Sequence, residues 1–163
     1  MKTITRKYKV YSIDELSEDA RAKALEKLYD INVDYEDWSE CTLDEAKEKL
    51  VTMGYSEPKI YFSGFSSQGF ECTVDLAQWI KSHDKTYQKK YKFILQYVYD
   101  TTEAQDILLN ELEEKIIEDA RSEADNIYRS LSKEYDNQTS EEAILETIKV
   151  NEYTFLEDGS IFN

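Results

Sequence analysis

The chain has 163 residues and a formal net charge of -15, from 35 acidic and 20 basic side chains. A hydrophobic fraction of 40% with 13% aromatic residues excludes a disordered acidic chain, and the length suits one domain over residues 1–163. Cys41 and Cys72 form no CxxC motif, which argues against a zinc knuckle or a disulfide framework.

The N-terminus lacks the apolar stretch of a signal peptide. No apolar run approaches the roughly 20 residues that span a bilayer. We therefore expect a cytoplasmic protein that does not enter a membrane.

The first third of the chain predicts one strand and two helices. Residues 2–11 alternate loosely between polar and apolar side chains, which predicts a strand with one basic face. Ser17 is a suitable N-cap for a helix over residues 18–31. A capping box beginning at Thr42 predicts a second helix that ends at Gly54.

The middle of the chain changes to a strand pattern. Residues 59–76 place apolar side chains two apart around a Ser- and Gly-containing centre, which predicts a β-hairpin. Residues 91–99 are rich in aromatic and β-branched side chains and predict another strand. Between these strands lies the basic stretch Lys81–Lys92, which we expect to pair with acidic side chains of this chain or of a second copy.

The clearest element is a long helix after Thr102, which forms a capping box with Gln105. From Ala104 to Tyr135 an apolar stripe recurs every three or four residues without Gly or Pro, which predicts a helix roughly 50 Å long. A short capped helix, a terminal strand and a turn follow. The expected fold is α+β: a small, mostly antiparallel sheet covered by helices, with one long C-terminal acidic helix.

The negative charge is concentrated at the C-terminal end. Residues 1–100 hold 18 acidic and 15 basic side chains, whereas residues 101–163 hold 17 and 5. Such an asymmetric field disfavours direct binding of nucleic acid by the C-terminal part and favours a basic partner. It also suits a merely solubilising surface.

The densest part of the long helix is the candidate partner-binding surface. Duplex DNA presents about one charge per 1.7 Å, so this helix is too dilute to imitate a full duplex but could imitate part of a phosphate backbone. The partner-binding candidates are Glu111, Glu113, Glu114, Glu118, Asp119, Glu123 and Asp125.

Signs of catalysis and of cofactor binding are weak. His83 is the only histidine, so no catalytic triad can be built without it. Glu114 and Glu118 could hold a hard cation, but their spacing is equally expected on a solvated face, and no phosphate-binding glycine motif is present. We therefore expect a non-enzymatic protein that binds neither a metal nor a cofactor.

One loop keeps a different class of function open. Residues 63–69 contain small and polar residues that could contact a small molecule, with Ser63, Phe65 and Gln68 as the candidate ligand-binding residues. The glycines of this loop are also explained by the backbone angles of a hairpin connection. A small-molecule-binding or enzymatic domain is therefore an alternative, and a structural or regulatory homodimer is a third.

Two segments of the chain carry a family resemblance: Phe62-Ser63-Gly64-Phe65-Ser66-Ser67-Gln68-Gly69-Phe70-Glu71-Cys72 and the earlier Tyr11-Ser12-Ile13-Asp14-Glu15-Leu16-Ser17. Both resemble a widespread group of small bacteriophage proteins of unassigned function. Members of that group are sometimes labelled antitoxin-like. Their pattern has Gly-Asp-Gly after the Gln, where this chain has Gly69-Phe70-Glu71. The resemblance implies a phage origin and no particular mechanism.

Together these features predict a non-enzymatic phage protein that inhibits a basic, nucleic-acid-binding host protein. A defence protein of the CRISPR or restriction type would be such a target. The acidic helix would occupy its basic groove, and the phage protein itself would bind no nucleic acid.

Overall fold

The computed structural model describes residues 3–35, 37–65, 68–96 and 102–162, and its fold is α+β. Contacts divide the chain into two compact units: residues 1–39 with 133–163, and residues 40–132. The helices α2 (Asp37–Thr52) and α6 (Glu103–Gln138) each run across a boundary between them. The prediction of a single domain stays a prediction.

The first unit packs two helices against a small antiparallel sheet. Its elements are η1 (Ile13–Glu15), α1 (Glu18–Lys27), α7 (Glu141–Val150), β3 (Thr154–Phe155) and β4 (Ile161–Phe162). Ser17 and Ser140 cap α1 and α7 through their side-chain oxygens, and the cap at Ser17 is the one that the sequence predicts. The core consists of Ile13, Ala24, Leu28, Ile144, Ile148 and Phe155.

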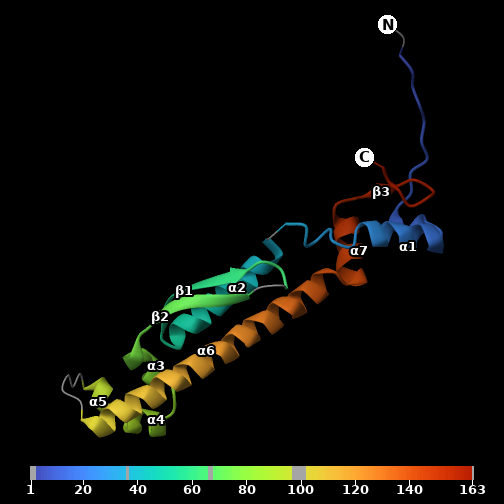
Figure 1. Ribbon diagram of the computed structural model, residues 1–163. Coiled ribbons are helices and arrows are strands. Elements are labelled where there is room, and N and C mark those ends of the chain that lie inside the picture. The colour runs from blue at the N-terminus through green and yellow to red at the C-terminus, as the bar shows by residue number, and fades with distance from the viewer. Residues whose placement is uncertain (1–2, 36, 66–67, 97–101, 163) are drawn as a thin grey trace. The chain divides into compact units, whose positions relative to one another are not determined.

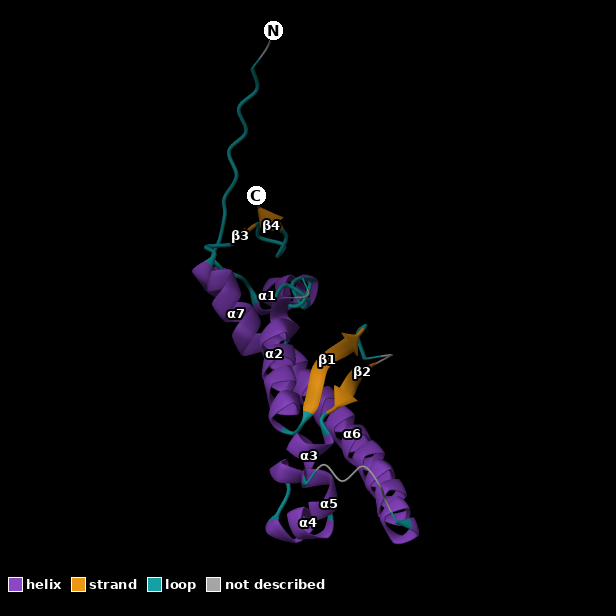
Figure 2. Ribbon diagram, turned by 90° about the vertical axis from the view of Figure 1, so that its left-hand side faces the viewer, coloured by secondary structure: helices purple, strands orange, loops and turns teal. Residues whose placement is uncertain are grey.

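The second unit contains a β-hairpin, most of α2 and α6, and three short helices. Its further elements are β1 (Tyr55–Phe62), β2 (Gln68–Val74), α3 (Leu76–Ser82), α4 (Lys85–Lys90) and α5 (Lys92–Leu95). In both views α2 and the hairpin lie alongside α6, and α3 to α5 gather near its N-terminal end (Figures 1 and 2). The hairpin is antiparallel, with Tyr55 opposite Val74 and Phe62 opposite Gln68.

The core of the second unit is built around large side chains. Trp79, Ile80 and Tyr55 are fully buried, and Tyr91 and Leu112 are nearly so. Helix α6 buries one stripe, as its sequence spacing predicts, and this stripe consists of Leu112, Ile116, Glu123, Ile127 and Leu131. One member of the stripe is a carboxylate, which the apolar pattern alone does not reveal.

Three local predictions are wrong. Residues 91–99 do not begin a strand: Lys92–Leu95 is helical, with Gln96 N–H donating to Lys92 O over 3.1 Å, and residues 97–99 lie outside the described part. Strand propensity is overridden here because Tyr91 packs its ring against Tyr87, 5.3 Å away, in a helical cluster.

The other two errors concern the first predicted strand and the start of α2. Residues 3–10 form no strand, and only Tyr11 makes a bridge, to Phe155. A loose alternation carries strand information only when a neighbouring strand is present to pair with. Helix α2 begins at Asp37, so Thr42 lies inside it and does not cap it. The confirmed elements are the hairpin, the long α6, the capped helices α1 and α7, and a terminal strand, β3, that is followed by a turn.

Candidate acidic interface on the long helix

The outward face of α6 is set by its buried stripe. At 3.6 residues per turn, Glu111, Glu114, Glu118 and Asp125 project away from Leu112, Ile116 and Ile127, and all four are exposed. From Glu111 to Asp125 the helix rises about 21 Å. Four of the seven predicted carboxylates thus share one outward face, and Glu113 is exposed on a flank of it.

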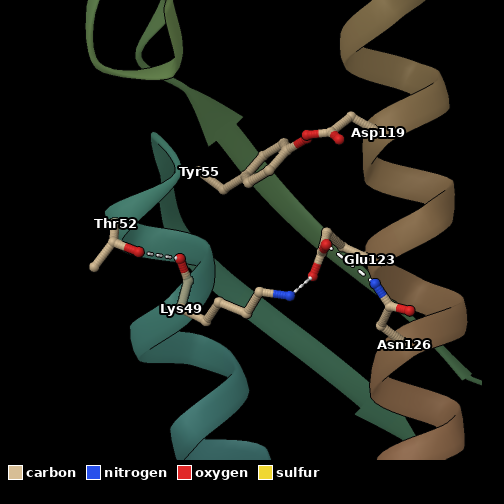
Figure 3. A network of polar contacts seen from close by, with 6 residues as sticks. All are labelled: Lys49, Thr52, Tyr55, Asp119, Glu123 and Asn126. Atoms are coloured by element: carbon tan, nitrogen blue, oxygen red, sulfur yellow. Dashed lines mark hydrogen bonds and ion pairs between the residues drawn. The ribbon is translucent and has the colours of Figure 1, made fainter. Parts of the chain in front are cut away.

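Glu123 lies on the opposite side of the helix, facing α2. Only 8% of its surface is exposed, and Lys49 Nζ lies 2.5 Å from its Oε2 (Figure 3). Asn126 Nδ2 donates to the other carboxylate oxygen over 3.1 Å. A buried carboxylate is tolerated when such partners replace its lost hydration. Glu123 therefore holds α2 to α6 and is not available to another protein.

Asp119 also faces the interior of the second unit. The hydroxyl of the fully buried Tyr55 donates to its Oδ2 over 3.1 Å and accepts from the indole N–H of Trp79 over 3.3 Å. Burial raises the pKa of Tyr55, with the nearby Asp119 carboxylate adding to the effect. Asp119 is only partly exposed. Its carboxylate points toward the Tyr55 ring (Figure 3) and completes a polar chain inside the unit.

Two of the outward carboxylates have basic neighbours. Lys90 Nζ lies 2.6 Å from Glu111 Oε2, and Lys115 Nζ lies 2.5 Å from Glu118 Oε2. The hydrogen bond from Lys115 lowers the pKa of Glu118, and both lysine pKa values are raised by their carboxylate partners. Exposed ion pairs of this kind are worth about 0–1 kcal/mol, so either carboxylate could exchange its lysine for another cation.

The remaining three candidates, Glu113, Glu114 and Asp125, are exposed and make no ion pair or hydrogen bond with any residue of the described part. Between them stands Ile117, of which 50% is exposed. Because Ile117 follows Glu113 by four positions and Glu114 by three, its side chain neighbours each of these two carboxylates on the helix surface. Ile117 was not among the partner-binding residues predicted from the sequence. Its position directly after Ile116, just outside the buried stripe, could have identified it as an exposed apolar side chain.

The basic stretch neutralises the acidic helix only in part. Among Lys81, Lys85, Lys89, Lys90 and Lys92, Lys90 alone forms an ion pair with an acid of the described residues. The other four are exposed on α3, α4 and α5. The outward face of α6 consequently keeps Glu113, Glu114 and Asp125 outside these ion pairs, and the exposed Arg121 and Arg129 also lie on this helix.

One of the three residues predicted for the alternative ligand site at the hairpin connection, Phe65, packs against other aromatic rings of the second unit. The ring of Phe65 lies 5.4 Å from that of Phe62 and 5.7 Å from that of Tyr128 on α6. Gly64 has φ +61°, so a turn requires it here. The side chain of Gln68 and residues 66–67 lie outside the described part, and Ser63 forms a bridge with Phe65.

His83 takes part in aromatic packing. Its ring lies 3.9 Å from that of Trp79, and its Nδ1 lies 2.7 Å from the Trp79 carbonyl oxygen.

Within the described residues, no three His, Cys, Asp or Glu side chains converge as metal ligands would. None of the helices in that part of the chain has the length and apolar character needed to cross a membrane.

Comparison of the chain with protein-family models, with curated proteins and with solved structures found no match.

Proposed function

We propose that this protein is a non-enzymatic binding protein whose acidic α6 face docks into a basic groove of a nucleic-acid-binding protein. The observation that carries the proposal is the exposure of Glu113, Glu114 and Asp125, which make no ion pair or hydrogen bond with the described residues. With Glu111 and Glu118 they form the acidic face, a set of five carboxylates around one exposed apolar side chain. Asp119 and Glu123 have structural roles and are left out of it.

Charge density limits what the acidic face can imitate. Five carboxylates over about 21 Å compare with about 12 phosphates over the same length of duplex. The face therefore suits a short basic patch, such as the mouth of a nucleic-acid groove. Long-range attraction would mainly accelerate association and make it sensitive to salt.

Apolar contact would supply much of the binding energy. Ile117 is half exposed and is flanked by carboxylates, which is the arrangement of an apolar anchor with a polar surround. Its burial against a partner would contribute about 1–2 kcal/mol. If the chain comes from a phage, as its resemblance implies, a host defence protein of the CRISPR or restriction type would be a fitting target.

The test compares two triple variants of equal charge. One carries Glu113→Gln, Glu114→Gln and Asp125→Asn on the acidic face, and its control carries Glu142→Gln, Glu146→Gln and Glu157→Gln in the first unit. Immobilised wild-type protein is used at low salt to capture basic proteins from a bacterial lysate. Each captured protein is then purified, and its binding to nucleic acid is measured by fluorescence anisotropy with the wild type or a variant as competitor.

We expect the wild type and the control triple to displace the nucleic acid equally, and the face triple to need about tenfold more protein. An Ile117→Ser variant should be similarly impaired without any change of charge. Equal competition by both triples would mean that the effect comes from net charge and not from the acidic face. Failure of the wild type to displace nucleic acid from any captured protein would refute the proposal.

A further inference from the structure

The N-terminal arm, residues 3–10, is an extended segment that pairs with no strand of the described structure. Its three largest apolar side chains are exposed: Ile4 by 79%, Tyr8 by 53% and Val10 by 43%. No backbone hydrogen bond joins the arm to another described segment. Figure 1 shows it running from the N-terminus as an extended trace. Eight residues in this conformation reach about 26 Å.

The arm has a fixed root. Tyr11 exchanges two backbone hydrogen bonds with Phe155, of 2.8 and 2.9 Å, and Ile13 is buried immediately after it. On its other side β3 pairs with β4. One ring contact extends this anchoring to Tyr8, whose ring lies 5.3 Å from that of Phe162. The arm is therefore a strand-like segment attached to the first unit at Tyr11, and its backbone pairing with the rest of the chain stops at that residue.

The composition of the arm is opposite to that of the rest of the chain. It carries Arg6, Lys7 and Lys9 and no acidic residue, whereas residues 12–163 hold 35 acidic and 16 basic side chains. Two arms would repel one another, so pairing of arm with arm is disfavoured. An acidic surface is the complementary partner, and each further copy of this chain supplies one.

A matching strand edge exists in the second unit. The hairpin has two strands, so the outer edge of β2 has no strand partner among the described residues (Figure 2). The outer edge of β1 is a poor template, because Pro58 lacks an N–H and the register shifts between Ser56 and Lys59. β2 has seven residues and no proline, and it carries the exposed Glu71.

We propose that the N-terminal arm of one copy adds as a third strand to the outer edge of β2 in a second copy. Backbone hydrogen bonds would supply the pairing, as in other strand-addition complexes. The lengths agree, with eight residues in the arm and seven in the edge strand. Attraction between Arg6, Lys7 or Lys9 and the exposed Glu71, the acidic side chain of β2, would favour this partner over another arm.

The two native cysteines allow a direct test. The donor chain carries Cys41→Ser and Cys72→Ser and a single cysteine scanned through residues 3–10. The acceptor chain carries only Cys41→Ser and so keeps Cys72 in β2, with a size tag to distinguish it. Paired strands place Cα atoms about 4.5–5.5 Å apart, which a disulfide can span. The measured quantity is the rate of donor–acceptor disulfide formation.

A matched acceptor carries Cys72→Ser and keeps Cys41, which is exposed on α2. Random collision favours this control, because Cys41 is the more exposed thiol and burial raises the pKa of Cys72. We expect Cys72 to react at least tenfold faster than Cys41 with the best arm positions. The rates should alternate along the arm with a period of two, because strand side chains alternate between faces.

Neutralising the arm provides the second measurement. A donor that also carries Arg6→Gln, Lys7→Gln and Lys9→Gln, with its single cysteine at Thr5 or Tyr8, should react with Cys72 at least tenfold more slowly. Faster reaction at Cys41, a flat profile along the arm, or reaction with neither acceptor would overturn the proposal. These outcomes leave the acidic face untested, so the two proposals fail separately.

Discussion

The ammonium group of Lys49 lies 2.5 Å from the carboxylate of Glu123, and this ion pair connects α2 to α6 inside the second unit. The two ends of the pair differ in environment, because the lysine side chain is 54% exposed and the carboxylate side chain only 11%. Removing the lysine would therefore strand a buried charge, whereas removing the carboxylate would leave an ammonium that water can still reach.

Lys49→Met should consequently destabilise the protein more than Glu123→Gln. We expect a loss of about 2–4 kcal/mol for Lys49→Met and about 1–2 kcal/mol for Glu123→Gln, since a stranded buried charge is the costlier defect. Urea unfolding followed by circular dichroism measures both values. Glu113→Gln on the exposed face is the control and should change the free energy of unfolding by less than about 0.5 kcal/mol. The reverse order of the two losses would contradict this account of the pair.

Tyr55→Phe removes the hydroxyl that links Trp79 to Asp119. The Trp79 N–H then loses its acceptor in a fully buried site, which should cost about 1–3 kcal/mol. Tyr61→Phe is the matched control, because the Tyr61 hydroxyl is exposed, bonds to Glu71 and should contribute little. Chemical unfolding of both variants tests the difference. Equal effects would show that the buried polar chain is not a source of stability.

Alkaline pH should weaken the fold through Tyr55. Because its pKa is raised in the folded state, the protein favours the neutral phenol. The resulting stabilisation is complete below the pKa of an unfolded tyrosine, near about 10, and is lost as the pH rises above it. Comparing unfolding midpoints of wild type and Tyr55→Phe between pH 9 and 11 isolates this contribution. The wild type should lose more stability over that interval, and parallel curves would count against it.

Two glycines provide a matched test of packing. Gly54 has φ +97°, and a Cβ there would lie 2.4 Å from the backbone nitrogen of Trp79. Gly64 has φ +61° and nothing within 4 Å of such a Cβ. Gly64→Ala should cost about 1 kcal/mol for its backbone angle, and Gly54→Ala about 3 kcal/mol or more because Trp79 must also move. Thermal unfolding of the two variants measures the difference, and similar melting temperatures would exclude the steric contribution.

Local sequence signals identified most of the regular elements correctly. The stripe from Ala104 to Tyr135 and the cap at Thr102 predicted α6, and the paired apolar positions around the hairpin predicted β1 and β2. These signals succeed because helix periodicity, side-chain caps and turn glycines act over a few residues. The same kinds of signal failed at Tyr91, where a packed helical cluster with Tyr87 replaces the predicted strand, and at Thr42, because α2 begins five residues earlier.

The sequence by itself determined the charge of the long helix, its buried stripe and the basic character of the N-terminal arm. Only the tertiary structure decided which carboxylates serve the fold: Glu123 meets Lys49 across 74 positions, and Asp119 meets Tyr55 across 64. Helical spacing places Asp119 and Glu123 three and seven positions after Ile116, on the buried side of α6, but it cannot name their partners, because Tyr55 and Lys49 lie on other elements. The acidic face is therefore a smaller set than the charged sequence predicts, and the partners supplied by α2 and β1 define it.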